Sequence, residues 1–239
     1  MRDLLVVVPS RGRPQNIARL AKAMAATCKG DTHLLVGLDA DDPTRAEYPE
    51  LLGVEYVVQD GLRQVVRWLN ELSVPNTSHY RFIGTLGDDN VPLTDGWDVR
   101  VIESLERNLF CYADDLYPGR ETGTLCCHVF MRSEVIQALG YMAAPAFLHM
   151  YCDPAWLALG EATSIEFMAD VLIEHRHYSA GKSDWDETYA ASHATTQHDL
   201  EAFNEYMRTD FNTDVEKLRG IPFTEAQRAE FNARLNIPG

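Results

Sequence analysis

The stretch "RFIGTLGDDN", residues 81–90, sets the problem that the rest of the chain must solve. Its apolar run, 82–86, predicts a buried strand, and a glycine ends that run before Asp88, Asp89 and Asn90. Two adjacent carboxylates repel each other, and burying either one without a partner costs several kcal/mol. We therefore expect a positive group to lie beside Asp88 and Asp89.

Upstream of this stretch, apolar strands alternate with amphipathic helices. The run "LLVVV", residues 4–8, predicts a strand buried on both faces, and Pro14 suits the first turn of the helix that follows. This alternation predicts an α/β fold with a mainly parallel sheet flanked by helices. The predicted strands are 4–8, 33–39, 54–59 and 80–86, and the predicted helices are 15–28 and 61–72.

The second half of the chain has a less regular pattern. Asp153 and Pro154 predict a helix with an aspartate N-cap and proline at the first helical position. Residues 164–178 predict paired strands, and the polar tail predicts helices, one of them beginning at Thr224. We expect one domain over 1–192 with a helical extension over 193–239. Further helices are predicted at 97–106 and from Ser133, after a strand, and a polar loop or short helix at 40–53.

Composition is that of an ordinary globular protein. The chain has 239 residues, of which 46% are hydrophobic and 24% are charged. No apolar run approaches the ~20 residues of a membrane span, and the strand-like start does not resemble a signal peptide. These features predict a soluble cytoplasmic protein.

Charge and cysteine usage argue against two classes of site. The formal net charge of −15 disfavours a broad non-specific grip on nucleic acid, although a local basic patch stays open. The five cysteines are odd in number and form no CxxC. They predict reduced, mostly buried thiols and argue against a structural zinc site built on cysteines.

The ends of the predicted strands carry the polar residues that a ligand would meet. In open α/β sheets, ligands bind beyond the carboxyl ends of the strands. We expect these residues to converge on one rim although they lie far apart in the sequence. They are Ser10, Arg11, Arg13, Asp39, Asp41, Asp42, Asp88, Asp89 and Asn90.

Two of these strand ends suit a metal ion and a phosphate. The carboxylates of Asp88 and Asp89 suit Mg²⁺ or Mn²⁺, with a solvated turn as the alternative. In "PSRGRP", residues 9–14, Arg11 and Arg13 match phosphate oxygens, with a surface turn as the alternative. The stretch is not a Walker loop, because GxxxxGK[ST] is absent.

Two further signals come late in the chain. His175 and His177 would point to the same side of a strand, so either could join a metal site; the alternative is a pair of surface histidines. Asp153 could act as a catalytic base, or it could only cap its helix. If Asp153 is not the base, Asp184 or Asp186 is the next candidate.

The order of these motifs resembles the nucleotide-sugar glycosyltransferases of the GT-A fold. It is most similar to family 2-like members that are often encoded by bacteriophages, and the resemblance covers Leu4 to Tyr189. It implies a GT-A, Rossmann-like mixed sheet. It also implies a metal-dependent enzyme, in the host cytoplasm if phage-encoded, that uses Mn²⁺ or Mg²⁺ to move a sugar from a nucleoside-diphosphate donor to a hydroxyl.

The same resemblance implies roles for the aspartates. Asp89 would hold the metal on the diphosphate, and Asp88 would contact the ribose or the metal. The sequence departs from a strict DxD motif, because Gly87 or Asn90 stands where an aspartate is expected. Asp39 would contact the nucleobase.

Further roles follow from the resemblance for residues in both halves of the chain. Asp153 would be the general base, and His175 or His177 would bind metal or phosphate. The residues placed near the nucleobase or the phosphates are Pro9, Ser10, Arg11, Arg13, Arg63 and Lys182.

The acceptor and the class of protein stay open at this point. The phage-like resemblance suggests a hydroxymethylated pyrimidine in DNA as one acceptor, and the acidic charge argues against it. The competing interpretations are a nucleotidyltransferase and a non-catalytic module that binds a sugar nucleotide.

Overall fold

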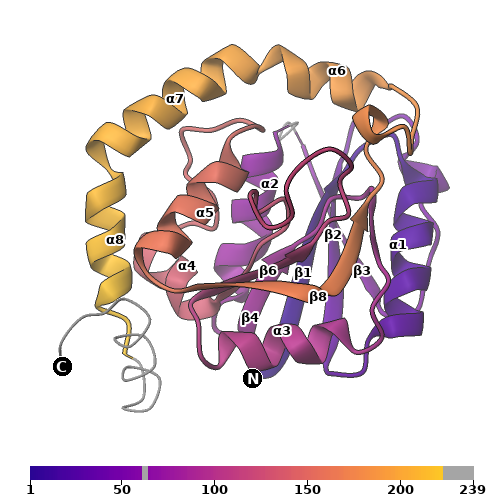
Figure 1. Ribbon diagram of the computed structural model, residues 1–239. Helices are drawn as coiled ribbons and strands as arrows, with labels where there is room; N and C mark the ends of the chain where they lie inside the picture. Colours follow the sequence, from indigo (N-terminus) through magenta and orange to yellow (C-terminus); the bar gives the residue numbers. More distant parts are fainter. Residues whose placement is uncertain (61–63, 223–239) are drawn as a thin grey trace.

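A single mixed sheet forms the centre of the molecule. The computed structural model describes residues 1–60 and 64–222. Its eight strands lie in the order β3-β2-β1-β4-β7-β6-β8-β5, with helices on both sides (Figure 1). The predicted α/β architecture with a mainly parallel sheet is confirmed.

The first half of the chain builds the parallel part of this sheet. Residues of β1 pair with β2 on one side and β4 on the other, and β2 pairs with β3, all in parallel. Parallel pairing brings the carboxyl ends of these strands to one edge. The strands are β1 (Arg2–Ser10), β2 (Thr32–Asp39), β3 (Val54–Gln59) and β4 (Tyr80–Thr85).

Both faces of β1 are buried, as its unbroken apolar run predicted. Leu4, Val6 and Val8 belong to a core shared with α1 (Pro14–Thr27) and α3 (Trp97–Leu105). Leu5 and Val7 face the opposite core. Helices packed in that second core are α2 (Val65–Ser73), α4 (Ser133–Leu139) and α5 (Cys152–Ala162).

The second half completes the sheet with antiparallel and parallel pairs. The segment 164–178, predicted as paired strands, is one strand, β8 (Ile165–His175). It does not fold back, because its first half pairs with β6 and its end pairs with β5. The other strands are β5 (Asn90–Pro92), β6 (Phe110–Asp114) and β7 (Phe130–Arg132). Short 3₁₀ turns are Arg45–Glu47, Val74–Asn76 and Tyr178–Ala180.

Within the described residues, three helices follow β8 and curve around the molecule as an arc (Figure 1). They are α6 (Glu187–Ala194), α7 (Thr196–Thr209) and α8 (Phe211–Arg219). Helix α8 packs against α4 and α5, and its Val215 and Leu218 are buried in the second core. The division of the chain at residue 192 stays a prediction, and the helix predicted from Thr224 lies outside the described residues.

Helix α5 begins earlier than the sequence predicted. Its N-cap is Tyr151, whose carbonyl accepts the first helical hydrogen bond from the Ala155 N–H. Tyr151 has a left-handed backbone, with φ of 66°, which turns the chain sharply into the helix. Asp153 is therefore the second helical residue and not the N-cap, and Pro154 is the third. Among the helices of the described residues, none is long and apolar enough to cross a membrane.

Candidate functional site

Strands β1, β2 and β4 place the predicted polar residues on one rim. Ser10 is the last residue of β1 and Asp39 the last of β2, while Asp88 and Asp89 lie in the turn between β4 and β5. Ser10, Asp39, Asp88 and Asp89 are all buried. The convergence predicted from strand order is confirmed for these residues.

Arg13 supplies the positive charge that the adjacent carboxylates required. It is 8% exposed, and its Nη1 donates to Asp88 Oδ1 at 3.0 Å. Its Nε and Nη2 donate to the two oxygens of Asp186, both at 2.7 Å. Ser10 Oγ donates to the other oxygen of Asp88 at 2.7 Å. The guanidinium therefore bridges Asp88, at the end of β4, to Asp186, just before α6.

The two adjacent aspartates differ in electrostatic state. Burial raises the pKa of Asp88 to about 6, although the charge of Arg13 opposes the rise. Burial acts in the same direction on Asp89, but His175, Tyr189 and Arg13 outweigh it and hold the pKa of Asp89 below its ordinary value. Asp89 therefore keeps its negative charge to lower pH than Asp88 does.

Asp89 joins the end of β8 to α6. Its Oδ1 lies 3.4 Å from His175 Nε2, and its Oδ2 accepts a hydrogen bond of 2.8 Å from the Tyr189 hydroxyl. Burial lowers the pKa of His175, but the neighbouring Asp89 more than reverses this and raises it. His175 Nδ1 is buried and has no hydrogen-bond partner among the described residues.

His177 occupies a different environment from His175. Strand β8 ends at His175, so the prediction that His177 lies on the same strand is wrong, but the two rings still pack together with 5.1 Å between their centroids. His177 Nδ1 lies 2.5 Å from Ser179 Oγ and accepts from the Ser179 N–H, so its side chain caps a 3₁₀ turn. Burial and the charge of His175 lower the pKa of His177 to about 4. Its ring still packs on Tyr189, at 4.7 Å between centroids.

Asp153 lies in the first turn of α5 and is half-buried. Burial raises its pKa to about 6, and the nearby charges of His175 and Arg120 and a hydrogen bond with Cys127 limit the rise. A carboxylate with a pKa near neutrality can accept a proton and release it again, which is what a general base requires.

The loop before α5 is held by the carboxyl-terminal arc. Asp199, fully buried in α7, accepts hydrogen bonds from the backbone N–H groups of Leu148, His149 and Met150 at 2.7–3.0 Å. These residues immediately precede Tyr151 and the start of α5. An aspartate in a polar helix is the only local signal for this contact, and it does not identify the partner, so sequence reasoning missed Asp199.

Asp39 and Arg11 form a second charged group on the rim. Asp39 Oδ1 accepts from the indole N–H of Trp68 at 2.9 Å, and Oδ2 lies 3.1 Å from Arg11 Nη1. Arg11 also contacts Asp41 at 2.7 Å. Asp42 is held apart from this pair, because it accepts the backbone N–H of Gly12 and caps its own turn.

The remaining predicted site residues have simpler surroundings. Pro9 pairs in register with Gly37 of β2, within the sheet. Lys182 lies in the loop after β8, where its ammonium contacts Glu174 at 3.1 Å and donates to the Leu116 carbonyl at 3.2 Å. Arg63 lies outside the described residues.

Asp186 and Tyr189 are site residues whose roles the sequence did not reveal. The sequence indicates Asp186 only as a reserve base, yet it is the bidentate partner of Arg13 and caps α6 by accepting the Tyr189 N–H. The Arg13 guanidinium also stacks over the Tyr189 ring, with 4.1 Å between Arg13 Cζ and the ring centroid. An aspartate directly before a helix is an N-cap signal, but nothing local indicates a contact with Arg13, 173 residues away.

Three potential metal ligands gather next to this rim. One ligand atom each from Asp115, Cys127 and His175 lies within 4.8 Å of the other two. Of the five cysteines, all are free and three are buried, as predicted. A carboxylate, a thiol and an imidazole can together hold a divalent ion.

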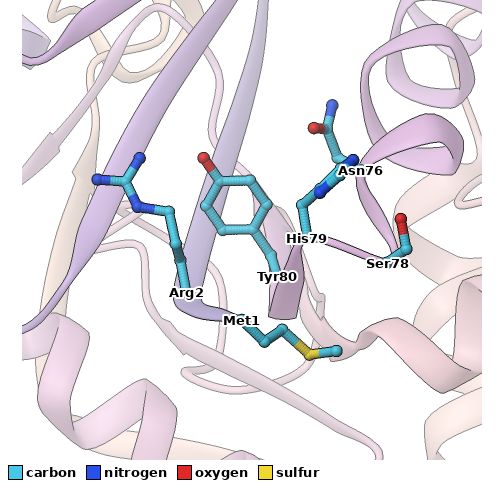
Figure 2. A pocket seen from close by; sticks show the side chains of 6 residues that line it. All are labelled: Met1, Arg2, Asn76, Ser78, His79 and Tyr80. Atoms are coloured by element: carbon cyan, nitrogen blue, oxygen red, sulfur yellow. The ribbon is translucent and has the colours of Figure 1, made fainter.

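A separate cavity lies at the opposite edge of the sheet. It has a volume of about 390 Å³ and is lined by side chains that include Arg2 at the start of β1 and Tyr80 at the start of β4 (Figure 2). It therefore lies at the amino ends of the parallel strands, away from the rim that carries Asp88 and Asp89.

Comparisons with known proteins give structural but not sequence relatives. No protein-family model and no curated protein matches the chain. TarS 1–349 from S. aureus, in complex with UDP, is similar over 88% of this chain and 73% of its own, with 10% identity and a TM-score of 0.56. A longer TarS structure is covered over 44% of its length.

Two further solved structures show the same arrangement. The mannosyltransferase PcManGT from Pyrobaculum calidifontis, in complex with GDP-Man and Mn²⁺, is similar over 100% of this chain and 81% of its own, with 11% identity and a TM-score of 0.55. The catalytic domain of Drosophila β1,4-galactosyltransferase 7 is similar over 81% of this chain and 80% of its own, with 12% identity and a TM-score of 0.51. At these identities the likeness shows the fold alone, and that fold is the predicted GT-A fold.

Proposed function

We propose that this protein is a metal-dependent glycosyltransferase that moves a sugar from a nucleoside-diphosphate donor to a hydroxyl acceptor with inversion. The observation that carries the proposal is the rim itself. There a buried arginine, a charged aspartate and the partly buried Asp153, whose pKa is raised, come from strands and helices far apart in sequence. The structural neighbours support the donor class, since they are bound to UDP or GDP-Man.

The donor diphosphate would lie on the Arg13 side of the rim. Guanidinium groups match phosphate oxygens, and Arg11 and Arg13 both follow β1. Asp39, held by Trp68 and Arg11, is placed at the end of β2 for the nucleobase. Asp88 would contact the ribose or the metal, with Pro9, Ser10 and the loop residue Lys182 as further donor contacts. Arg63 is the last of the residues that we propose to contact the donor.

Asp89 and His175 would hold a Mn²⁺ or Mg²⁺ ion. They fit such an ion because Asp89 is ionised and its Oδ1 lies 3.4 Å from Nε2 of His175, so a carboxylate oxygen and an imidazole nitrogen face each other. When bound, a divalent cation neutralises charge on the departing diphosphate. Manganese is present in the PcManGT structure. His177 is the second candidate ligand, although it already caps a turn.

Asp153 would be the general base. In its ionised form it accepts the proton of the acceptor hydroxyl as that oxygen attacks the anomeric carbon. The nucleoside diphosphate departs from the opposite face, so no covalent intermediate forms and the configuration inverts. General base catalysis contributes ~10²–10⁴-fold to the rate.

Asp153→Asn tests this role. Asp153 is not the N-cap, and Asn has nearly the same volume, so the fold and donor binding should be retained while transfer falls ~10²–10⁴-fold. We would measure melting temperature, nucleoside-diphosphate binding and sugar transfer on both proteins. A matched control is Asp170→Asn, an exposed aspartate of β8. Normal transfer by a stable Asp153→Asn protein would reject the base and redirect the search to Asp184 or Asp186.

A donor panel separates this proposal from its alternatives. Product formation would be followed by mass spectrometry with UDP-, GDP- and dTDP-sugars, Mn²⁺, and hydroxyl acceptors that include DNA containing hydroxymethylated pyrimidines. Transfer of a sugar to any acceptor supports a glycosyltransferase. Transfer to the DNA substrate would show that the protein modifies DNA despite its net charge of −15. Pyrophosphate release from a nucleoside triphosphate and a sugar phosphate would indicate a nucleotidyltransferase. Binding without turnover would indicate a sugar-nucleotide-binding module.

A further inference from the structure

We propose that Asp115, Cys127 and His175 form a binding site for a thiophilic divalent cation such as Zn²⁺, separate from the Asp88 and Asp89 pair. One ligand atom of each lies within 4.8 Å of the others. The sequence argued against a structural zinc site built on several cysteines. This site uses a single thiol and recruits its other ligands from two strand ends.

Three segments of the second half of the chain meet at this site. Asp115 directly follows β6, Cys127 precedes β7, and His175 ends β8. The backbone N–H of His175 donates to the Asp115 carbonyl at 2.9 Å, so two of the ligands are fixed relative to each other by the sheet. Cys127 comes from the segment 115–129, which contains no helix or strand and can adjust.

Imidazole, thiolate and carboxylate are the three side-chain ligand types of zinc. Zinc sites with three protein ligands keep a fourth position open, and the ligands lie at ~2.0–2.3 Å from the ion. Ligand atoms of a tetrahedral site are therefore roughly 3.6 Å apart. The separations of up to 4.8 Å would have to close by about 1 Å, which rotation of the Cys127 and Asp115 side chains can supply.

His175 has a buried nitrogen that needs a partner. Its Nδ1 is enclosed and makes no hydrogen bond among the described residues, while its Nε2 lies beside Asp89. Leaving a buried polar atom unpaired costs ~1–3 kcal/mol. A metal ion bound by His175, Cys127 and Asp115 would satisfy this imidazole.

A positive charge already lies against two of these ligands. The guanidinium of Arg120 contacts the Asp115 carboxylate, and its Nη2 lies 3.4 Å from Cys127 Sγ. The position therefore favours a cation, and an incoming metal ion would take the place of this guanidinium. Burial raises the pKa of Cys127, and Asp153 and Asp115 raise it further, so metal binding would release the thiol proton.

His175 would belong to both metal sites. It lies beside Asp89, the proposed ligand of the catalytic ion, as well as beside Asp115 and Cys127. If the proposed glycosyl transfer is correct, a thiophilic ion that takes His175 should inhibit it, and excess Mn²⁺ should not fully restore it. This consequence rests on the proposed function, whereas binding of the ion does not.

Co²⁺ is a suitable probe, because bonding between a thiolate and Co²⁺ produces a charge-transfer absorption in the near ultraviolet. Wild-type protein, reduced and metal-free, should bind one equivalent with this absorption, and Zn²⁺ should displace it. Cys127→Ser should abolish the band and weaken Zn²⁺ binding at least ~100-fold, since loss of even an outer partner of a metal ligand costs ~10–100-fold. Cys28→Ser is the matched control, because Cys28 is also partly buried but lies beside α1. It should keep the band.

Two more variants keep the test informative if Cys127→Ser folds poorly. Arg120→Ala removes the competing guanidinium and should bind Co²⁺ more tightly, a gain that unfolding cannot produce. Asp89→Asn should lose the joint effect of Mn²⁺ and nucleoside diphosphate but keep the cobalt band, which separates failure of this site from failure of the proposed function. Absence of the band in wild-type protein, its survival in Cys127→Ser, or weaker cobalt binding by Arg120→Ala would overturn the proposal.

Discussion

The two ends of the chain contribute to the same rim in different ways. Strands β1, β2 and β4 place Ser10, Arg13, Asp39, Asp88 and Asp89 there directly, each at or just beyond a strand end. The segment from the end of β8 through α7 contributes by side-chain contacts that lock those residues. His175, Asp186 and Tyr189 make these contacts, and Asp199 holds the loop before α5.

Helix α6 shows how closely the two regions are joined. Asp186, at its N-cap, binds Arg13, Thr188 donates to the Arg11 carbonyl at 3.0 Å, and Tyr189 donates to Asp89. The strand ends bring Asp88, Asp89 and Arg13 together, and the later segment supplies hydrogen-bond partners for Arg13 and Asp89. The site residues of the first region can therefore be predicted from local sequence pattern, whereas those of the second region are identified only from the folded structure.

Removing Arg13 should have the largest effect on stability. Arg13→Ala leaves Asp88 buried without its cation, and breaking a buried pair in this way costs about 3–5 kcal/mol. Arg11→Ala, in the same turn but one third exposed, should cost at most ~1 kcal/mol. Urea unfolding would measure both. Equal losses for the two variants would show that Arg13 is not the link between the regions.

Removing Asp199 should have the next largest effect. Asp199→Ala leaves three backbone N–H groups without their charged acceptor, and we expect a loss of about 3 kcal/mol in the free energy of unfolding. Because the loop before α5 would loosen, kcat should fall while nucleoside-diphosphate binding changes little. Glu201→Ala, an exposed site on the same helix, is the control and should change neither. Unaltered stability in Asp199→Ala would contradict the proposed anchoring of this loop.

The two histidines should differ in function as they differ in position. His175 contacts Asp89, whereas His177 is committed to capping a turn. We expect His175→Ala to reduce transfer at least tenfold more than His177→Ala, which corresponds to ~1.4 kcal/mol in the barrier. Steady-state kinetics on folded proteins would decide. Near-wild-type activity in both variants would show that neither histidine takes part in transfer.

The pH dependence of transfer should follow Asp153. Burial raises its pKa to about 6, so it is protonated and unable to act as a base below that pH. Because kcat/KM reports the free enzyme, we expect it to rise about tenfold between pH 5 and pH 7. Asp88, whose pKa is also raised to about 6, acts in the same direction. A profile that falls over this range would contradict the assignment of a carboxylate base.

Local sequence pattern is sufficient to predict the parallel part of the sheet. The β-branched run of β1 and the alternation that follows specify strand, helix and strand end, and the adjacent Asp88 and Asp89 by themselves indicate a positive partner. That partner is Arg13. These inferences succeed because each depends on residues close in sequence or on a general rule for parallel sheets.

The features that sequence reasoning missed depend on backbone geometry or on distant partners. The predicted start of α5 is wrong because Tyr151 adopts a left-handed conformation that its identity does not indicate. The prediction of two strands in place of β8 is wrong because the change of partner from β6 to β5 leaves no local mark. The bond between Arg13 and Asp186 spans 173 residues and forms only in the folded chain.

The most direct test of a single site built from two regions is a double-mutant cycle on Asp89 and His175. The readout is the stabilisation of the protein by Mn²⁺ together with UDP or GDP, which at ~100 times the dissociation constant is worth ~2.7 kcal/mol. We predict that Asp89→Ala and His175→Ala each remove most of this stabilisation, and that the double variant loses no more than either single one. Full stabilisation in either single variant, or losses that simply add, would contradict a shared site.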